Sequence, residues 1–179
     1  MTRSANQDRA DVEQVFSKYV ESIDAADVAL AAQVWLQSPD VLVVTPFGRF
    51  KGWDGVRDDI YVNFTQKQLR QRNLHTSNVS IVVAGDAAWL VYDFAFTATL
   101  GRWTASTSNG WESHGYLRTV DGWRIAHLHY SVQPHCRCGH GRRHRAPGSV
   151  ALSCAHPHWT SELAHQGRRT CACAPGGHE

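Results

Sequence analysis

Two histidines close to each other, His127 and His129, are the first candidates for acid–base chemistry in this sequence. They lie in the run Trp123–Ser131, which reads as a strand because it is rich in apolar and aromatic residues. Alternate residues of a strand share a face, so we expect both imidazoles to lie side by side with Ser131. In a partly dry pocket one of them would stay neutral and able to accept a proton near pH 7. Three roles remain open for the pair: proton transfer, contact with a ligand, or hydrogen bonding within a pocket wall.

Four further polar side chains could serve such a pocket. Tyr19 lies on an apolar helical stripe, and a buried phenol needs a partner, which a ligand oxygen or the protein itself could supply. Asp93 stands in the middle of an expected strand, where it would support a histidine or act as a base if it faces inward, and would be a solvated charge if it faces outward. Arg118 could bind a substrate carboxylate or form a salt bridge, and the same holds for His114.

Aromatic residues are abundant enough to line a pocket as well as a core. Aromatic side chains line small-molecule sites, and they also fill cores and dimer faces. The helices can cover one face of the expected sheet, so Trp89 and Val91 on the other face predict a homodimer through the outer sheet face. The residues expected at the ligand pocket are Trp35, Trp53, Tyr61, Trp111, Arg118 and Ser131.

The elements that must position these residues follow from hydrophobic periodicity. Apolar residues three and four apart predict helices over 8–25, 27–38 and 54–68, with Asp27 capping the second. Residues 41–51 read as a hairpin, and 79–84, 87–100, 111–120 and 123–132 read as strands joined by tight turns. The sequence therefore predicts an α+β fold in which three N-terminal helices pack on a curved antiparallel sheet.

Composition divides the 179 residues at about position 134. Residues 1–133 contain 17 of the 18 aromatic residues and no cysteine, with 12 Lys and Arg against 14 Asp and Glu. Residues 134–179 contain all five cysteines, seven of the eleven histidines, and six arginines against two glutamates. We expect one domain over 1–133, and over 134–179 a Cys/His/Arg-rich tail that is disordered, functional, or a shifted reading frame.

The same division excludes several functional classes. The positive charge belongs to the tail alone, so it predicts no nucleic-acid partner for the domain. The cysteines and histidines of the tail lack zinc-site spacing, so we expect no metal and no cofactor. No run of 18 apolar residues and no secretory leader pattern occurs, which predicts no membrane association and a cytoplasmic location.

The strand that carries the histidine pair also carries a family resemblance. Residues 121–131, read as D-G-W-x-I-x-H-x-H-x-S, resemble the terminal strand of nuclear transport factor 2-like proteins, with Asp40 and the segments 18–20, 52–55 and 85–88 in the matching order. The resemblance points to the SnoaL-like and ketosteroid isomerase-like branch and to the association domain of calcium/calmodulin-dependent protein kinase II. It implies a cone-shaped domain that encloses a pocket and is often a dimer.

The resemblance to ketosteroid isomerases supports Tyr19 and disfavours their reaction. Tyr19 matches their oxyanion-hole tyrosine, but Thr45 and Gly115 stand at the positions of their two acids. Threonine cannot take a proton from a carbon acid at neutral pH. The function expected is therefore a SnoaL-like protein that binds a small, partly apolar metabolite, with cyclase, isomerase or dehydratase chemistry by Tyr19, His127, His129 and Asp93 as its enzymatic form. The alternative is a non-catalytic ligand-binding or dimerisation module.

Overall fold

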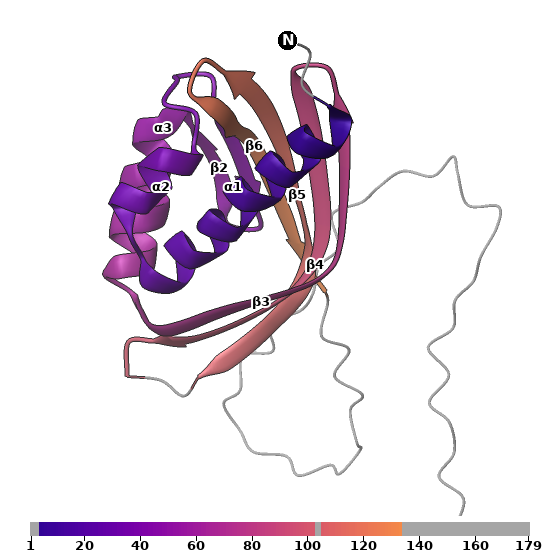
Figure 1. Ribbon diagram of the computed structural model, residues 1–179. Helices are drawn as coiled ribbons and strands as arrows, with labels where there is room; N and C mark the ends of the chain where they lie inside the picture. The colour runs from indigo at the N-terminus through magenta and orange to yellow at the C-terminus, as the bar shows by residue number, and fades with distance from the viewer. Residues whose placement is uncertain (1–3, 103–104, 134–179) are drawn as a thin grey trace, which may run out of the picture. The chain divides into compact units, whose positions relative to one another are not determined.

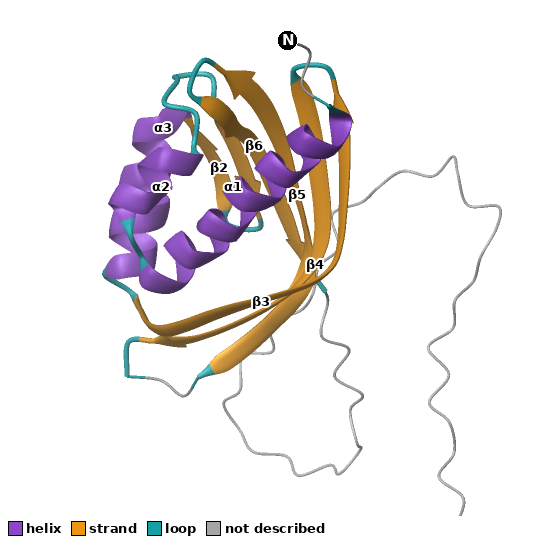
Figure 2. Cartoon of the chain, in the orientation of Figure 1, coloured by secondary structure: helices purple, strands orange, loops and turns teal. Residues whose placement is uncertain are grey.

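Three helical segments pack against the concave face of one curled, six-stranded sheet (Figure 1). The computed structural model describes residues 4–102 and 105–133, and the predictions for the Cys/His/Arg-rich tail lie outside these residues. Figure 2 shows that the helices lie on one side of the strands, so each strand has one face toward the helices and one face away from them. The α+β plan expected from the sequence is confirmed.

Local sequence signals account for the first two helices. Helix α1 spans Ala5–Ala25 and begins three residues before the prediction, because the Ser4 hydroxyl accepts a hydrogen bond from the backbone N–H of Gln7. Helix α2 spans Val28–Val34, and the carboxylate of Asp27 caps it as expected.

The third helical segment has an unusual winding. Its first turn, α3, spans Gly52–Gly55, and it continues as a π-helix, η1, over Val56–Gln66. The sequence predicts one α-helix here, since apolar spacing does not distinguish a helix whose hydrogen bonds run from i to i+5. The buried Thr65 hydroxyl donates to the carbonyl of Ile60, five residues before it, at 2.7 Å.

The sheet is mixed, whereas the sequence predicts an antiparallel one. The strands lie in the order β2-β1-β6-β5-β4-β3, and β1 pairs with β6 in parallel while all other neighbours are antiparallel. The paired residues of β1 and β6 are 85 positions apart in the chain, for example Val43 and Leu128, and local patterns do not reveal such a pairing. The strand bounds are β1 Leu42–Thr45, β2 Gly48–Lys51, β3 Leu69–Ala84, β4 Ala87–Leu100, β5 Ser106–Thr119 and β6 Gly122–Val132.

Strand β3 is ten residues longer at its start than predicted. The extra segment is polar, and it lies at the edge of the sheet, where only β4 pairs with it. Two irregularities interrupt this pairing beside Gln71 and Asn78, whose φ angles are 40° and 53°. Bulges of this kind bend an edge strand and oppose its pairing with other chains.

A bulge in β6 decides which way the histidine pair points. Gly115 pairs with His127 and Tyr116 pairs with Ile125, so Ala126 is an extra residue in the ladder. The inward positions are therefore Trp123 and Ile125 before the bulge and Leu128 after it, all buried. The expectation that Trp123, Ile125, His127 and His129 share a face is wrong, because the inserted residue reverses the alternation.

Candidate functional site

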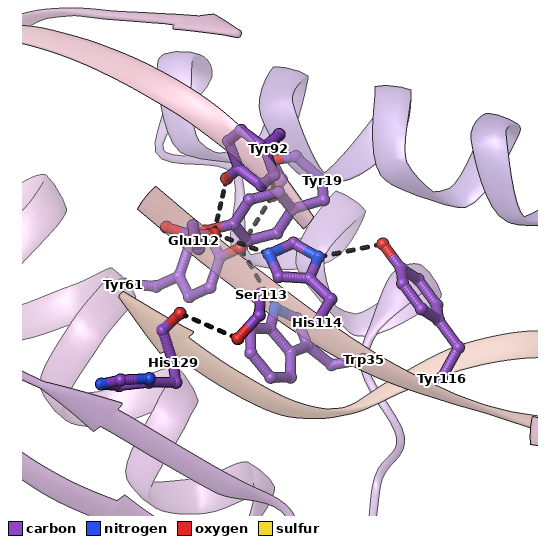
Figure 3. Close-up of polar contacts among 10 residues, drawn as sticks. Tyr19, Trp35, Tyr61, Tyr92, Glu112, Ser113, His114, Tyr116 and His129 are labelled. Atoms are coloured by element: carbon purple, nitrogen blue, oxygen red, sulfur yellow. Dashed lines mark hydrogen bonds and ion pairs between the residues drawn. The ribbon is translucent and has the colours of Figure 1, made fainter. Parts of the chain in front are cut away.

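A buried carboxylate, Glu112, is the centre of the polar groups inside the domain (Figure 3). Its Oε1 atom accepts hydrogen bonds from the Tyr19 hydroxyl at 2.9 Å and from the Tyr92 hydroxyl at 2.6 Å. The Nε2 atom of His114 lies 2.6 Å from the same oxygen. We call Tyr19, Tyr92, Glu112, His114 and Tyr116 the Glu112 cluster. Two phenols and one imidazole therefore converge on a single carboxylate oxygen.

Strand alternation and register bring the Glu112 cluster together. Glu112, His114 and Tyr116 occupy alternate, buried positions of β5, so all three side chains point toward the helices. Tyr92 of β4 pairs directly with Glu112, so its hydroxyl reaches across one strand spacing. Tyr19 comes from the buried stripe of α1 and completes the cluster from above the sheet.

His114 links the carboxylate to a third phenol. Its Nδ1 atom lies 2.9 Å from the Tyr116 hydroxyl, while its Nε2 atom faces Glu112. A neutral imidazole protonated on Nε2 satisfies both contacts, because the Tyr116 O–H then donates to Nδ1. The chain of hydrogen bonds therefore leads from Tyr116 through His114 to Glu112.

Burial and the negative charge of Glu112 keep the phenols of the Glu112 cluster protonated. Burial raises the pKa of Tyr19 well above its usual value of 10, and the charge of Glu112 raises it further. The same two causes, in the same order, raise the pKa values of Tyr92 and Tyr116. Near neutral pH these hydroxyls are therefore neutral hydrogen-bond donors.

A second polar group beside the Glu112 cluster satisfies its own hydrogen bonds. Ser22 donates to the Tyr19 carbonyl at 2.7 Å and lies 2.8 Å from the Tyr61 hydroxyl, and the Nε1–H of Trp35 donates to that hydroxyl at 3.3 Å. Trp35 and Tyr61, two of the expected pocket residues, thus have protein partners. Trp53, a third, is half-buried and packs against the hydrophobic core.

The structure does not bring the other expected site residues to the Glu112 cluster. The β6 bulge turns His127 and His129 to the outer face, and Trp111, which is 48% exposed, points away from the interior because it neighbours the inward-facing Glu112. Asp93 also faces outward, where it accepts a hydrogen bond from Asn78 Nδ2 at 2.7 Å. Ser131 pairs with Trp111 and shares its face.

Arg118 has protein partners of its own. Its guanidinium forms ion pairs with Asp8 at 2.6 Å and Asp86 at 2.9 Å, and it lies over the Trp123 ring at 4.4 Å. The sequence left two roles open for Arg118, binding a substrate carboxylate or forming a salt bridge. The structure contains the salt bridge.

Sequence reasoning missed the residue at the centre. It named His114 and placed the acid position at Gly115, three residues after Glu112. The available signal was that Glu112, His114 and Tyr116 have the same parity in a strand whose odd positions include Trp111 and Leu117. Placing Trp111 at the pocket conceals the carboxylate, because Glu112 would then face outward.

The described part of the chain contains neither a cluster of metal ligands nor a helix suited to a membrane. Residues 4–102 and 105–133 contain no group of three or more His, Cys, Asp or Glu side chains placed to hold a metal ion. Among the same residues, no helix has the length and apolar character needed to cross a membrane.

Solved structures with the same fold include several proteins of bacterial origin. A nuclear transport factor 2-like superfamily protein from Salmonella enterica is 28% identical, with a TM-score of 0.71 and coverage of 78% of this chain and 100% of that chain. A candidate dehydratase of the same superfamily from Streptomyces avermitilis is 17% identical, with a TM-score of 0.65 and coverage of 73% and 99%. A hexachlorocyclohexane dehydrochlorinase from Novosphingobium barchaimii is 17% identical, with a TM-score of 0.63 and coverage of 73% and 92%.

The family itself is shown by sequence. No curated protein matches the chain. A model of the SnoaL-like domain family matches residues 4–129, which is more than half of the chain, and the curled sheet with its three helical segments is the cone fold of the superfamily. The protein therefore belongs to the SnoaL-like domain family of the nuclear transport factor 2-like superfamily.

Proposed function

We propose that residues 1–133 bind a small, partly apolar molecule next to Glu112, and that Glu112 exchanges a proton with it. One observation carries this proposal. The imidazole of His114 and the phenols of Tyr19 and Tyr92 all contact the same buried oxygen of the Glu112 carboxylate. Buried polar clusters with several titratable groups are common at functional sites. Two of the structural neighbours with named activities, a dehydrochlorinase and a candidate dehydratase, are consistent with elimination chemistry that begins with proton transfer.

The hydrogen bonds of Glu112 assign different tasks to its two oxygens. All three hydrogen bonds that described residues make to the carboxylate of Glu112 involve its Oε1 atom. Oε2 is therefore the atom that would accept a proton from the ligand. His114 and Tyr92 hold the carboxylate in place, and Tyr19, whose pKa is raised by burial, would supply a hydrogen bond to a ligand oxygen by exchanging its partner.

The side chains next to Glu112 suit an apolar ring. Tyr130 of β6 pairs with Glu112 across the sheet and is half-buried, and the Phe94 ring lies edge-on to it at 5.9 Å. Burial, with the charge of Glu112 as the second cause, raises the pKa of Tyr130 to about 12, so this phenol also remains a neutral donor near pH 7. Aromatic walls with a few hydrogen-bonding groups are typical of small-molecule sites.

Deuterium exchange at the α-carbon of a ketone tests this proposal directly. Cyclohexanone and acetophenone serve as probes in D2O, and one-dimensional proton spectra follow the loss of their α-proton signals. The unmodified protein should accelerate the exchange, and Glu112→Gln should reduce the acceleration at least a hundredfold because an amide accepts no proton. Glu13→Gln on the exposed side of α1 is the matched control.

Circular dichroism establishes first that the variant is folded, and Tyr92→Phe offers a milder change of the Glu112 cluster. Acceleration that persists in a folded Glu112→Gln protein would contradict the assignment. A protein that shifts its melting temperature with either probe and accelerates no exchange would be the non-catalytic binding module instead.

The outer sheet face favours a second function, homodimerisation. Trp89, Val91, Trp111 and Leu117 are 42–49% exposed and stand on two adjacent strands of this face. An exposed apolar face of this kind marks an interaction site, and we propose a second copy of the chain as the partner. Light scattering during gel filtration should give a dimer for the unmodified protein and a monomer for Trp89→Lys. A monomeric unmodified protein would refute the proposal.

A further inference from the structure

We propose that a groove on the helical side of the domain binds a small zwitterion with an apolar side group, such as a free amino acid. The groove has a volume of about 500 Å³ and lies between one side of α1, the last residues of α2, and the turn that joins β5 to β6. Ligand sites commonly have volumes of roughly 300 to 1,000 Å³. None of its lining residues belongs to the Glu112 cluster, so the groove is independent of the site proposed above.

The charged side chains that line the groove are of both signs. Asp11 and Lys18 stand on α1, and Asp121 and Arg124 flank the β5–β6 turn. Lys18, Asp121 and Arg124 form no ion pair with any residue of the described ranges 4–102 and 105–133. The only hydrogen bond of the Arg124 guanidinium within these ranges joins its Nη1 to the Trp123 carbonyl at 2.9 Å, which leaves most of its donors for a ligand.

The surface between the charges is apolar. Val15 of α1 is partly buried, while Val34 and Trp123 are almost fully buried, and all three line the groove. Trp123 Nε1 is a buried nitrogen with no hydrogen-bond partner among the described residues. An unsatisfied buried donor is costly, and its resonance is a sensitive local probe of any acceptor that enters beside the ring.

The presence of cationic and anionic side chains in one groove is what selects a zwitterion. A simple anion would be attracted by Lys18 and Arg124 but repelled by Asp121, and a simple cation would be attracted by Asp121 but repelled by Lys18 and Arg124. A zwitterion pairs with both sets at once. Its apolar side group would then cover the valines and the indole of the groove.

Nuclear magnetic resonance titration of the uniformly ¹⁵N-labelled full chain tests this inference. The probes are L-phenylalanine and L-leucine, and the matched single-charge probes are phenylacetate and 2-phenylethylamine. We expect the amino acids to shift the backbone resonances of the groove and the indole N–H of Trp123. We expect Lys18→Gln and Asp121→Asn each to weaken the binding at least tenfold, because each removes one of the two charge contacts. Lys67→Gln, outside the groove, is the matched control and should leave the affinity unchanged.

The outcomes separate the inference from its alternatives. If neither amino acid shifts the groove resonances at 20 mM, the groove is not a zwitterion site. If phenylacetate or 2-phenylethylamine binds as tightly as phenylalanine, or if the two charge variants bind like the control, the selection argument is wrong. The two proposals can also be told apart. If the ketone probes shift the resonances around Glu112 while neither amino acid shifts those of the groove, the Glu112 site stands and the groove proposal is wrong.

Discussion

All five tyrosines of this chain have raised pKa values, and this makes the folded domain sensitive to base. The pKa of Tyr61 is raised to about 12 by burial, although its hydrogen bonds with Ser22 and Trp35 act in the opposite direction. The pKa values of Tyr19, Tyr92 and Tyr116 are raised well above 10 by burial, with the charge of Glu112 as the second cause. An unfolded chain would release these protons near pH 10.

The sign of the effect follows from proton binding. Above pH 10 the unfolded state binds fewer tyrosine protons than the folded state, so the free energy of unfolding falls as the pH rises. The stability contribution of each tyrosine is complete below pH 10 and is lost between pH 10 and the folded-state pKa. At pH 11 the loss is about 1.4 kcal/mol for each tyrosine that remains protonated in the folded state.

Four of the tyrosines, Tyr19, Tyr61, Tyr92 and Tyr116, are at most 5% exposed, so solvent screening does not reduce their share. Together they lower the stability by roughly 5 to 6 kcal/mol at pH 11, which is comparable to the whole free energy of unfolding of a small domain. Cooperative unfolding near pH 11 is therefore the expected result.

Absorbance at 295 nm and circular dichroism at 222 nm, recorded on the same samples from pH 8 to 12.5, check this expectation. Tyrosinate absorbance should appear together with the loss of helical signal, in one transition steeper than a single-proton titration. Matched spectra of the protein in 6 M guanidinium chloride should show independent tyrosines with a pKa near 10. If two or more tyrosines ionise near pH 10 while the helical signal is intact, the buried hydrogen-bonded cluster described above is wrong.

Two further predictions concern stability. Gly110→Ala should lower the free energy of unfolding by about 2 to 4 kcal/mol, because a Cβ atom there would overlap the carbonyl oxygen of Ser131 and press on the Phe94 ring. Gly55→Ala is the control, because the space at its Cβ is open and the change should not destabilise the domain. Urea unfolding of the two variants compares them, and equal midpoints would show that the close approach of β5 and β6 is absent. Asp27→Ala should lower the free energy of unfolding by about 1 kcal/mol through loss of the α2 cap, whereas Asp40→Ala should lower it by less than about 0.5 kcal/mol. An unchanged melting temperature of the Asp27→Ala protein would rule out the capping interaction.

The amino-acid sequence by itself determined the elements whose signals are local. The apolar stripe of α1, the Asp27 cap of α2 and the β1–β2 hairpin each depend on residues within one or two turns of chain, so periodicity and capping chemistry suffice to find them. The α+β class follows from the order of these elements, and the run from Asp121 to Ser131 carries enough of the family pattern to indicate the superfamily.

Tertiary structure alone decided which polar residues meet. The single extra residue at Ala126 turns His127 and His129 away from the interior, and a strand pattern cannot reveal it because a bulge is defined by the partner strand. Glu112 reaches Tyr19 across 93 residues of chain, and its partner Tyr92 is fixed by the register of β4 on β5. Sequence shows which side chains could do chemistry, while pairing and packing over long separations set the face and the neighbours of each, and so the candidate site is a property of the folded chain.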